Sequence, residues 1–228
     1  RLDPRQLKQR DWLMLSIGSV VALSLLVVAT LVTRDQEVPL KPQVAKITSP
    51  WIPDTVKRWE GPIVEMAKKY DMDPNLLAII MTLESGGYSQ AESEIGAKGL
   101  LQITPPTAGD IAAKHLKEPV ETYDLSDPRT NIEFGAAYLA YLREEFGEQS
   151  QAPSWNATVE LIAAGYNGGP GTAGKLYRGE GITNTEAVAY SRDAYNMWRE
   201  RHANTSPTYD RWFERGGSRL IEKANSER

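Results

Sequence analysis

Apolar residues recur at helical spacing over much of the chain that follows residue 53. In two segments, around residues 128–146 and 159–166, most of them recur at intervals of three, four or seven positions, which places them on one face of a helix. No stretch of useful length alternates between apolar and polar residues, so a sheet of any size is not expected. We therefore predict an all-α, or mainly α, fold. The residues that form the two stripes are Ile132, Ala136, Leu139 and Phe146, followed by Val159, Ile162, Ala163 and Tyr166.

Three helix starts are marked by a capping residue followed by proline. Asp and Thr side chains accept hydrogen bonds from the free backbone N–H groups of a first turn, and proline is tolerated at the first helical position. We therefore expect helices to begin at these three points. The pairs are Asp73-Pro74, Thr104-Pro105 and Asp127-Pro128.

Weaker signals predict three more helices. Asp54 is expected to cap a helix that runs towards Tyr70. Thr183 and Glu186 have the spacing of a capping box, which predicts a helix near residues 184–203. A last helix is expected from about residue 207 to 224, with a loosely attached tail as the alternative.

A long apolar segment precedes the helical region. Residues 12–33 contain no charged residue and are rich in Leu, Val, Ile and Ala, and about 20 such residues span the hydrocarbon core of a bilayer. A buried helix of a soluble domain is one alternative, but few such helices are apolar on every side. A cleavable signal peptide is another, although its apolar region usually has about 7–15 residues. We predict an N-terminal transmembrane helix.

The charges around this segment predict its orientation. Four basic residues precede it within the first ten positions, whereas the residues that follow it are of mixed sign. The positive-inside tendency then places the short N-terminus in the cytoplasm and the rest of the chain outside. The predicted organisation is a cytoplasmic N-terminus (1–11), a transmembrane helix (12–33), a proline-containing linker (34–53), a helical domain (54–204) and a C-terminal helix or tail (205–228).

Composition excludes several classes of function. The net charge is −4 over 228 residues, and the predicted soluble part is acidic, so nucleic acid is not an expected partner. The chain has no cysteine and therefore no disulfide framework or thiolate nucleophile. It has 2 histidines, His115 and His202, which argues against a His-rich metal site. No cofactor or metal is expected.

Glu84 is the strongest candidate for chemistry. It ends an apolar helical run from Pro74, and Leu77, Ile80 and Met81 share its helix face. Desolvation raises the pKa of a carboxyl group, and a Glu with a pKa near neutrality can act as a general acid. The alternative is an ordinary helix-end Glu that pairs with Lys98 or another cation.

Two later blocks favour the catalytic interpretation. Gly99-Leu-Leu-Gln-Ile103 places the amide of Gln102 among apolar residues after a flexible loop, and Ala164-Gly-Tyr-Asn-Gly-Gly169 ends a helix on a phenol and an amide. Each block taken singly is more often structural, since a glycine such as Gly168 often ends a helix. Their order and spacing to Glu84 make a shared site the better hypothesis.

Together these blocks resemble the lytic transglycosylases of the lysozyme-like superfamily, the family built around the catalytic domain of soluble lytic murein transglycosylase. The resemblance covers roughly residues 60–200, and the Glu-Ser-Gly-Gly sequence also occurs in membrane-attached members. It implies a lysozyme-like transglycosylase domain. The matching blocks are Glu84-Ser85, Gly99-Leu-Leu-Gln-Ile103, Asn131-Ile-Glu-Phe-Gly-Ala-Ala-Tyr-Leu139 and Ala164-Gly-Tyr-Asn-Gly-Gly169.

The resemblance implies a role for each matching residue. Glu84 matches the single catalytic acid and base of the family. Ser93 matches a serine that contacts the N-acetylmuramyl unit, and Gln102 matches a glutamine that lines the cleft. Tyr166 matches the tyrosine that hydrogen-bonds to or orients the catalytic carboxyl group.

Four further residues are expected to contact the substrate. Ser85 directly follows Glu84, and Asn167 directly follows Tyr166. Tyr190 resembles a tyrosine of the final helix of the family. Thr104 stands where many relatives have a methionine that packs on the substrate, so the details of sugar packing are expected to differ here.

The resemblance implies a membrane-anchored peptidoglycan lytic transglycosylase. Such a carbon–oxygen lyase cleaves the β-1,4 bond between N-acetylmuramic acid and N-acetylglucosamine and forms 1,6-anhydromuramic ends with one carboxyl group. A lysozyme-like hydrolase is the first alternative, and it needs a second carboxylate, for which Glu92, Glu94 and Asp110 are candidates. A non-catalytic peptidoglycan-binding scaffold is the second.

The resemblance and the predicted membrane anchor together imply the partners and the location. The expected partners are peptidoglycan glycan strands and the bacterial cytoplasmic membrane, which residues 12–33 would cross once. The catalytic domain, residues 54–204, would then lie on the periplasmic or extracytoplasmic side. An unidentified envelope protein complex is also compatible with such an anchored enzyme.

Overall fold

The computed structural model describes residues 46–147 and 155–227. The chain divides into two units, residues 1–40 and 41–228, and the described residues belong to the second. The predicted cytoplasmic segment, the transmembrane helix at 12–33 and most of the linker lie outside the described residues. No helix of the described part is long and apolar enough to cross a membrane.

Helices account for nearly all regular structure in the described residues, so the predicted all-α class is confirmed there. The only extended pairing among them is a pair of isolated bridges, in which Lys98 lies opposite both Glu92 and Ile103. The helices are α2 (Asp54–Lys57), α3 (Glu60–Lys69), α4 (Pro74–Ser85), α5 (Pro105–Ile111), α6 (Pro128–Leu142), α7 (Trp155–Gly168), α8 (Pro170–Tyr177), α9 (Thr185–Glu200), α10 (Pro207–Trp212) and α11 (Ser218–Asn225). Short π-helical turns at Ala112–Leu116, Arg143–Gly147 and Phe213–Gly217 and a 3₁₀ turn at Val120–Thr122 complete the set.

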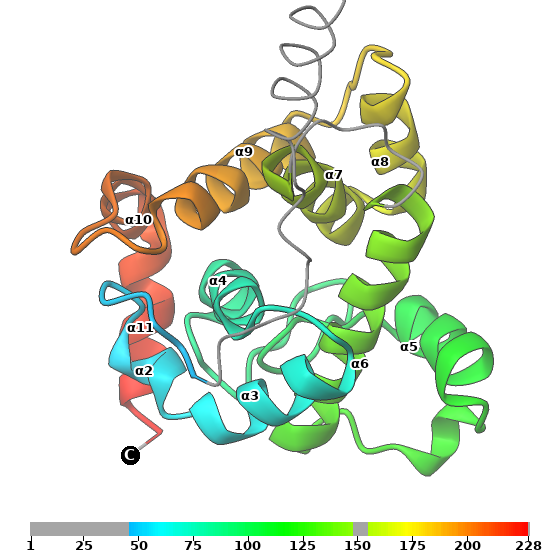
Figure 1. The fold of residues 1–228 in the computed structure, drawn as a ribbon. Coiled ribbons are helices and arrows are strands. Elements are labelled where there is room, and N and C mark those ends of the chain that lie inside the picture. Colours follow the sequence, from blue (N-terminus) through cyan, green and yellow to red (C-terminus); the bar gives the residue numbers. More distant parts are fainter. Residues whose placement is uncertain (1–45, 148–154, 228) are drawn as a thin grey trace, which may run out of the picture. The chain divides into compact units, whose positions relative to one another are not determined.

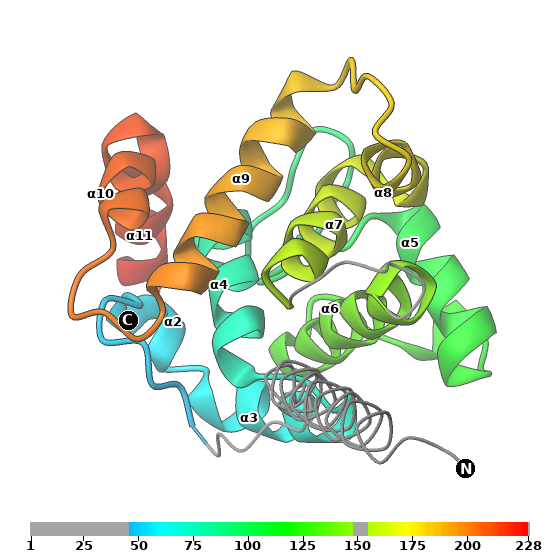
Figure 2. The ribbon, with the colours of Figure 1, turned by 45° about the horizontal axis from the view of Figure 1, so that its top comes forward.

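Helix α4 is the centre around which the other helices pack (Figure 1). It contacts α2, α3, α9 and α11, and the turned view in Figure 2 shows the same arrangement. Leu77, Ile80 and Met81 have no exposed surface. A helix that is apolar around most of its circumference is stable only when it is buried in this way. The helix that carries Glu84 is therefore held from several sides.

The three predicted capping residues are confirmed. Asp73, Thr104 and Asp127 each accept a hydrogen bond from a backbone N–H group of the turn that they precede. Proline occupies an early position in each of the three helices. These starts could be predicted because both the cap and the proline act within a single turn of helix.

Two other predicted capping residues are wrong, although helices begin close to both positions. Asp54 lies inside the first turn of α2, and Pro53 takes the position before the helix. In α9 the capping residue is Asn184 rather than Thr183, and its side chain accepts from the N–H of Ala187 at 3.0 Å. Asn caps a helix at least as well as Thr, so sequence alone does not decide between neighbours.

The first predicted helix, from residue 54 to 70, is two helices. The helix is interrupted at Arg58 and Trp59, between α2 and α3. The break directs both side chains to the carbonyl oxygen of Gly87, which accepts from Arg58 Nη2 at 2.7 Å and from Trp59 Nε1 at 3.1 Å. Helix α8, which begins at Pro170, was not predicted.

The segment after α9 packs on the rest of the domain and is not a loose tail. Helix α10 contacts α9, and α11 contacts both α2 and α4. The carboxylate of Glu200 accepts hydrogen bonds from the hydroxyl groups of Ser206 and Thr208, at 2.5 and 2.9 Å. The single helix predicted for 207–224 is broken at Gly216, where φ is 129°. This break lets α11 lie against the end of α4.

Candidate active site

Glu84 lies in the last turn of α4, where the helix stops abruptly. Gly86 caps the helix in the left-handed conformation, with φ of 62°, and its N–H is shared between the carbonyl groups of Met81 and Thr82. Glycine is favoured here because it has no side chain to strain. The predicted stop after Glu84 is confirmed, and the Glu84 side chain stays partly exposed while the helix behind it is buried.

The carboxyl group of Glu84 is held by a phenol rather than by a cation. Tyr190, on α9, donates a hydrogen bond from Oη to Oε1 of Glu84 at 2.6 Å. None of the ion pairs within residues 46–147 and 155–227 includes Glu84, and Lys98 is exposed. The alternative of an ordinary helix-end Glu paired with a cation is therefore wrong for the described residues.

The surroundings of Glu84 favour its protonated form. Burial raises the pKa of Glu84 to about 7, and the charge of Glu186 acts in the same direction. The hydrogen bond from Tyr190 favours the ionised form and lowers the pKa. The predicted upward shift is thus confirmed, and near neutral pH the group can both donate and accept a proton.

The structure gives the bond to the Glu84 carboxyl group to Tyr190 rather than to Tyr166. Tyr166, on α7, was expected to bond to the catalytic carboxyl group, but its hydroxyl donates to the carbonyl oxygen of Leu101 at 2.8 Å. It is still close enough to interact with the carboxyl group: burial raises the pKa of Tyr166 well above its usual value, and the charge of Glu84 acts in the same direction. Tyr190, expected only as a substrate contact, makes the direct bond. Its spacing of four residues from Glu186 places both on one face of α9.

Gln102 and Ser93 stabilise the loop that follows Glu84 in the sequence. Gln102 has a left-handed φ of 46°, and its Nε2 donates to the carbonyl oxygens of Ala91 and Gly99 at 3.1 and 3.0 Å. Ser93 Oγ accepts from the N–H of Ala97 at 3.0 Å. Both side chains are half-buried. The structure therefore gives each a role in fixing the loop, and their predicted substrate contacts stay predictions.

Ser85 is placed differently from the prediction. Its side chain has no exposed surface, and its hydroxyl donates to the carbonyl oxygen of Leu100 at 2.7 Å and accepts from the N–H of Gly87 at 3.1 Å. A buried hydroxyl with both partners satisfied is not available to a sugar. We therefore correct the predicted role of Ser85 from substrate contact to a link between α4 and the Gly99–Ile103 block.

Asn131 is a site-supporting residue that the sequence argument did not single out. Its side chain is fully buried at the start of α6. Its Oδ1 accepts from the N–H of Leu101 at 2.8 Å, and its Nδ2 donates to the carbonyl oxygen of Lys98 at 2.8 Å. It thereby fixes the turn that presents Gln102. The sequence indicated it only as the first residue of the matching block 131–139, and no local feature revealed its partners, Leu101 and Lys98.

The remaining predicted site residues lie on neighbouring elements. Thr104 caps α5, and its hydroxyl also lies 2.9 Å from that of Thr107. Asn167 follows Tyr166 on α7 and is half-buried. Substrate contacts by both stay predictions. In the described part of the chain, no group of His, Asp or Glu side chains is arranged to hold a metal ion.

The sequence of this domain matches a known protein family. A model of the family described as Transglycosylase SLT domain matches residues 61–189, more than half of the chain. The chain belongs to this family. The match to the SLT domain includes Glu84, Gln102 and Tyr166 but ends one residue before Tyr190. The bond from Tyr190 to Glu84 therefore comes from the structure and not from the family match.

Two relatives of this chain are named as lytic murein transglycosylases. Membrane-bound lytic murein transglycosylase E of Buchnera aphidicola subsp. Acyrthosiphon pisum is 31% identical over 149 residues, which are 62% of this chain and 65% of the relative. Membrane-bound lytic murein transglycosylase C of Actinobacillus pleuropneumoniae serotype 5b is 38% identical over 116 residues, 50% of this chain and 31% of the relative. The chain thus spans less than two thirds of either relative.

Two solved structures also align with the chain. One is an inactive mutant of the lytic transglycosylase Slt from Pseudomonas aeruginosa, with 24% identity, a TM-score of 0.46, and coverage of 68% of this chain and 24% of that one. The other is the 70 kDa soluble lytic transglycosylase from Escherichia coli, with 24% identity, a TM-score of 0.47, and coverage of 67% and 27%.

Proposed function

We propose that the chain is a peptidoglycan lytic transglycosylase that uses Glu84 as its single acid and base. The observation that carries the proposal is the environment of this carboxyl group: burial raises its pKa to about 7, and Tyr190 holds it at 2.6 Å. Membership of the SLT family and the names of the two relatives support murein as the substrate.

The proposed reaction needs only one carboxyl group. Protonated Glu84 donates its proton to the bridging oxygen as the bond from that oxygen to the anomeric carbon of N-acetylmuramic acid breaks. Ionised Glu84 then takes the proton of the muramyl 6-hydroxyl while the 6-oxygen bonds to the anomeric carbon. The proton returns to Glu84, no water is consumed, and a 1,6-anhydro end is left. A pKa of about 7 suits both steps.

Tyr190 and the surrounding chain serve the two protonation states differently. The hydroxyl of Tyr190 donates to Oε1 and stabilises the ionised carboxylate between the two steps. Burial stabilises the protonated form before the first step. The balance of these two effects keeps the pKa within reach of neutrality rather than far above it.

A lysozyme-like hydrolase is the second candidate, because one further carboxylate influences Glu84. The exposed Glu186 on α9 raises the pKa of Glu84 through its charge. The three acids that the sequence offered, Glu92, Glu94 and Asp110, are exposed and do not contribute to that shift. A hydrolase would need a second carboxylate about 5–9.5 Å from the acid, either as a nucleophile at the short end of this range or as the base that activates water at the long end, and Glu186 would then take that role.

The products separate these two candidates. We expect digestion of purified sacculi to release muropeptides with 1,6-anhydromuramic ends, which weigh one water less than hydrolytic products. Mass spectrometry of the soluble fragments checks this. Release of reducing muramic acid ends alone would establish a hydrolase, and loss of that activity in Glu186→Gln would then identify the second carboxylate.

The pH dependence tests the role of Tyr190. In the wild type we expect the rate to fall as pH rises above about 7, where Glu84 loses its proton. Tyr190→Phe removes a donor that favours the ionised form, so the alkaline limb should move to higher pH. The maximal rate should fall about tenfold because the carboxyl group is no longer held in place. The measurement is the initial rate of fragment release between pH 5 and 9.

Tyr166→Phe is the matched control for this experiment. It removes a hydroxyl that donates to Leu101 and not to Glu84, so the alkaline limb should stay where it is in the wild type. A limb that moves equally in both variants would contradict a specific role for Tyr190.

We also propose that the domain is held at the outer face of the bacterial cytoplasmic membrane by one helix, residues 12–33. The apolar pattern of this segment, the basic residues before it and the word membrane-bound in the names of both relatives support this. Such an anchor would place Glu84 on the side where peptidoglycan lies.

A further inference from the structure

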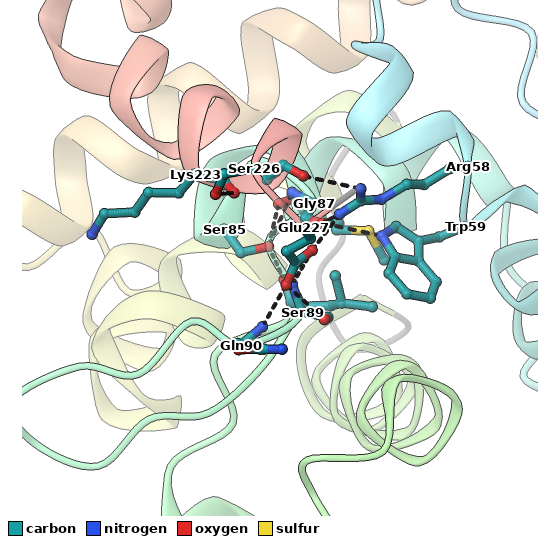
Figure 3. A network of polar contacts seen from close by, with 12 residues as sticks. Arg58, Trp59, Ser85, Gly87, Ser89, Gln90, Lys223, Ser226 and Glu227 are labelled. Atoms are coloured by element: carbon teal, nitrogen blue, oxygen red, sulfur yellow. Dashed lines mark hydrogen bonds and ion pairs between the residues drawn. The ribbon is translucent and has the colours of Figure 1, made fainter.

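Four hydrogen-bond donors meet on the carboxylate of Glu227, far from Glu84 in sequence (Figure 3). Its Oε1 accepts from Ser89 Oγ at 2.8 Å and from the N–H of Gln90 at 3.1 Å, and its Oε2 accepts from Arg58 and from the N–H of Ser89 at 3.3 Å. The side chain of Glu227 is only 13% exposed. A carboxylate that satisfies an Arg and two consecutive backbone N–H groups is held far more firmly than a surface ion pair.

Arg58 extends this cluster to the residue that follows the helix cap. Its Nη2 donates to the carbonyl oxygen of Gly87 at 2.7 Å as well as to Glu227, and its Nη1 donates to the carbonyl oxygen of Ala224 at 3.0 Å. One guanidinium group thus joins α11 to the loop after α4. The planar fork of Arg suits such divided donation, which a lysine ammonium group cannot reproduce.

The residues that this cluster holds lie shortly after Glu84 in the sequence and adjoin the loop that carries Gln102. Gly87, Ser89 and Gln90 are held by Arg58 and Glu227, and the next residue, Ala91, accepts through its carbonyl oxygen from Gln102 Nε2 and from the N–H of Gly99. The segment 87–91 is therefore fixed on one side by the Arg58–Glu227 pair and on the other by the Gln102 loop.

We propose that Glu227 and Arg58 form a clamp that positions segment 87–91 and, through it, the Glu84 carboxyl group and the Gln102 loop. Both are positioning residues, because neither contacts Glu84. The proposal rests on the catalytic role proposed for Glu84. It assigns a part in the reaction to the segment after α9, which none of the site residues inferred from sequence includes.

The test compares two variants of the same helix region in the full chain. Glu227→Gln keeps the shape of the side chain but removes the charge that faces Arg58. Glu222→Gln, on exposed surface of α11, is the matched control. Amide hydrogen exchange of residues 87–91 reports the clamp without any assay of activity. Steady-state kinetics on glycan fragments of defined length and a pH–rate profile report its effect on Glu84.

We expect Glu227→Gln to raise exchange at Ser89 and Gln90 about tenfold and to lower kcat several-fold with little change in KM, since an interaction with a charged group is lost. The alkaline limb should move to lower pH, because water reaches Glu84 and weakens the effect of burial. The groups that face Glu84 from α9 and α7, namely Tyr190, Glu186 and Tyr166, are unchanged. Glu222→Gln should match the wild type in every measurement.

Arg58→Lys adds an independent check. It should reproduce the kinetic effects of Glu227→Gln, and the double variant should be little worse than either single one, because both remove the same clamp. Unchanged exchange in Glu227→Gln would overturn the clamp. Raised exchange with unchanged kcat and pH profile would overturn its positioning role. Absence of cleavage by the wild type would instead overturn the proposed function, while the exchange result would still decide whether the clamp exists.

Discussion

Replacing Glu84 with Gln is expected to lower the rate of peptidoglycan cleavage about 10³–10⁴-fold, at the upper end of what a general acid and base contributes. The amide cannot donate a proton to the bridging oxygen or accept one from the 6-hydroxyl, so both proposed steps are lost together. The effect should be this large because the special environment belongs to this one side chain. Within the described residues, it is the carboxyl group of Glu84 that Tyr190 holds and whose pKa burial raises to about 7. The measurement is the rate of soluble fragment release from sacculi.

Glu92→Gln is the matched control for this variant. Glu92 is exposed on the loop between α4 and α5 and has no part in the shifted pKa of Glu84, so its replacement should leave the rate unchanged. Full activity in Glu84→Gln would exclude Glu84 as the acid. Absence of activity in the wild type, with binding to sacculi retained, would favour the scaffold alternative.

The stability of the same variant relative to the wild type should also increase as the pH rises. The folded-state pKa of Glu84, about 7, lies above its ordinary value of 4.5, so the folded state binds more protons between these values. The free energy of unfolding of the wild type should therefore fall as pH rises from 4.5 through 7. The free energy of unfolding of Glu84→Gln minus that of the wild type should be about 1–3 kcal/mol larger at pH 8 than at pH 4, after allowing for the partial exposure of the group. Urea unfolding at both pH values checks this and shows that the variant folds.

Gly87→Ala is expected to destabilise the domain strongly, because the added methyl group would clash with backbone atoms. Gly87 has a φ of +86°, and an added Cβ would lie 2.2 Å from the carbonyl oxygen of Thr55 and 2.6 Å from its carbonyl carbon. Both atoms belong to the backbone of α2, so no side chain can move aside. We expect a loss of about 3 kcal/mol or more in the free energy of unfolding and a fall in Tm of about 6–12 °C. Thermal unfolding followed by circular dichroism measures it.

Gly61→Ala provides the opposite expectation with the same chemical change. Gly61 is exposed in α3, and nothing lies within 4 Å of an added Cβ. Because alanine favours a helix more than glycine does, this variant should gain about 0.5–1 kcal/mol. Equal loss of stability in both variants would contradict the specific clash at Gly87. A stable Gly87→Ala would mean that α2 moves freely relative to α4.

The parts of the fold that could be predicted from sequence are those whose cause lies within one helical turn. Asp73 followed by Pro74, and Gly86 after Glu84, act on backbone groups that are two to five residues away. The upward shift in the pKa of Glu84 was also predictable, since Leu77, Ile80 and Met81 share its face and lead it into the core.

The parts that could not be predicted depend on side chains that meet across the chain. Tyr166 and Tyr190 are both half-buried phenols near the carboxyl group, and only the packing of α7 against α9 decides that Tyr190 bonds to Glu84. Ser85 resembled a polar residue beside a catalytic one, but its hydroxyl turns inward to Leu100. The partners of Glu227 lie more than a hundred residues earlier, and no local pattern indicates them.

The near-neutral pKa of Glu84 also has a consequence for how the domain responds to its surroundings. With a pKa of about 7, the fraction of molecules that carry the reactive proton changes from about one half to about nine tenths when the pH falls by one unit. In the proposed location outside the cytoplasmic membrane, the domain would be exposed to the acidity of the medium, which the cytoplasm does not buffer. The proposed cleavage of the wall would then become faster at acidic pH and slower at alkaline pH without an additional sensor.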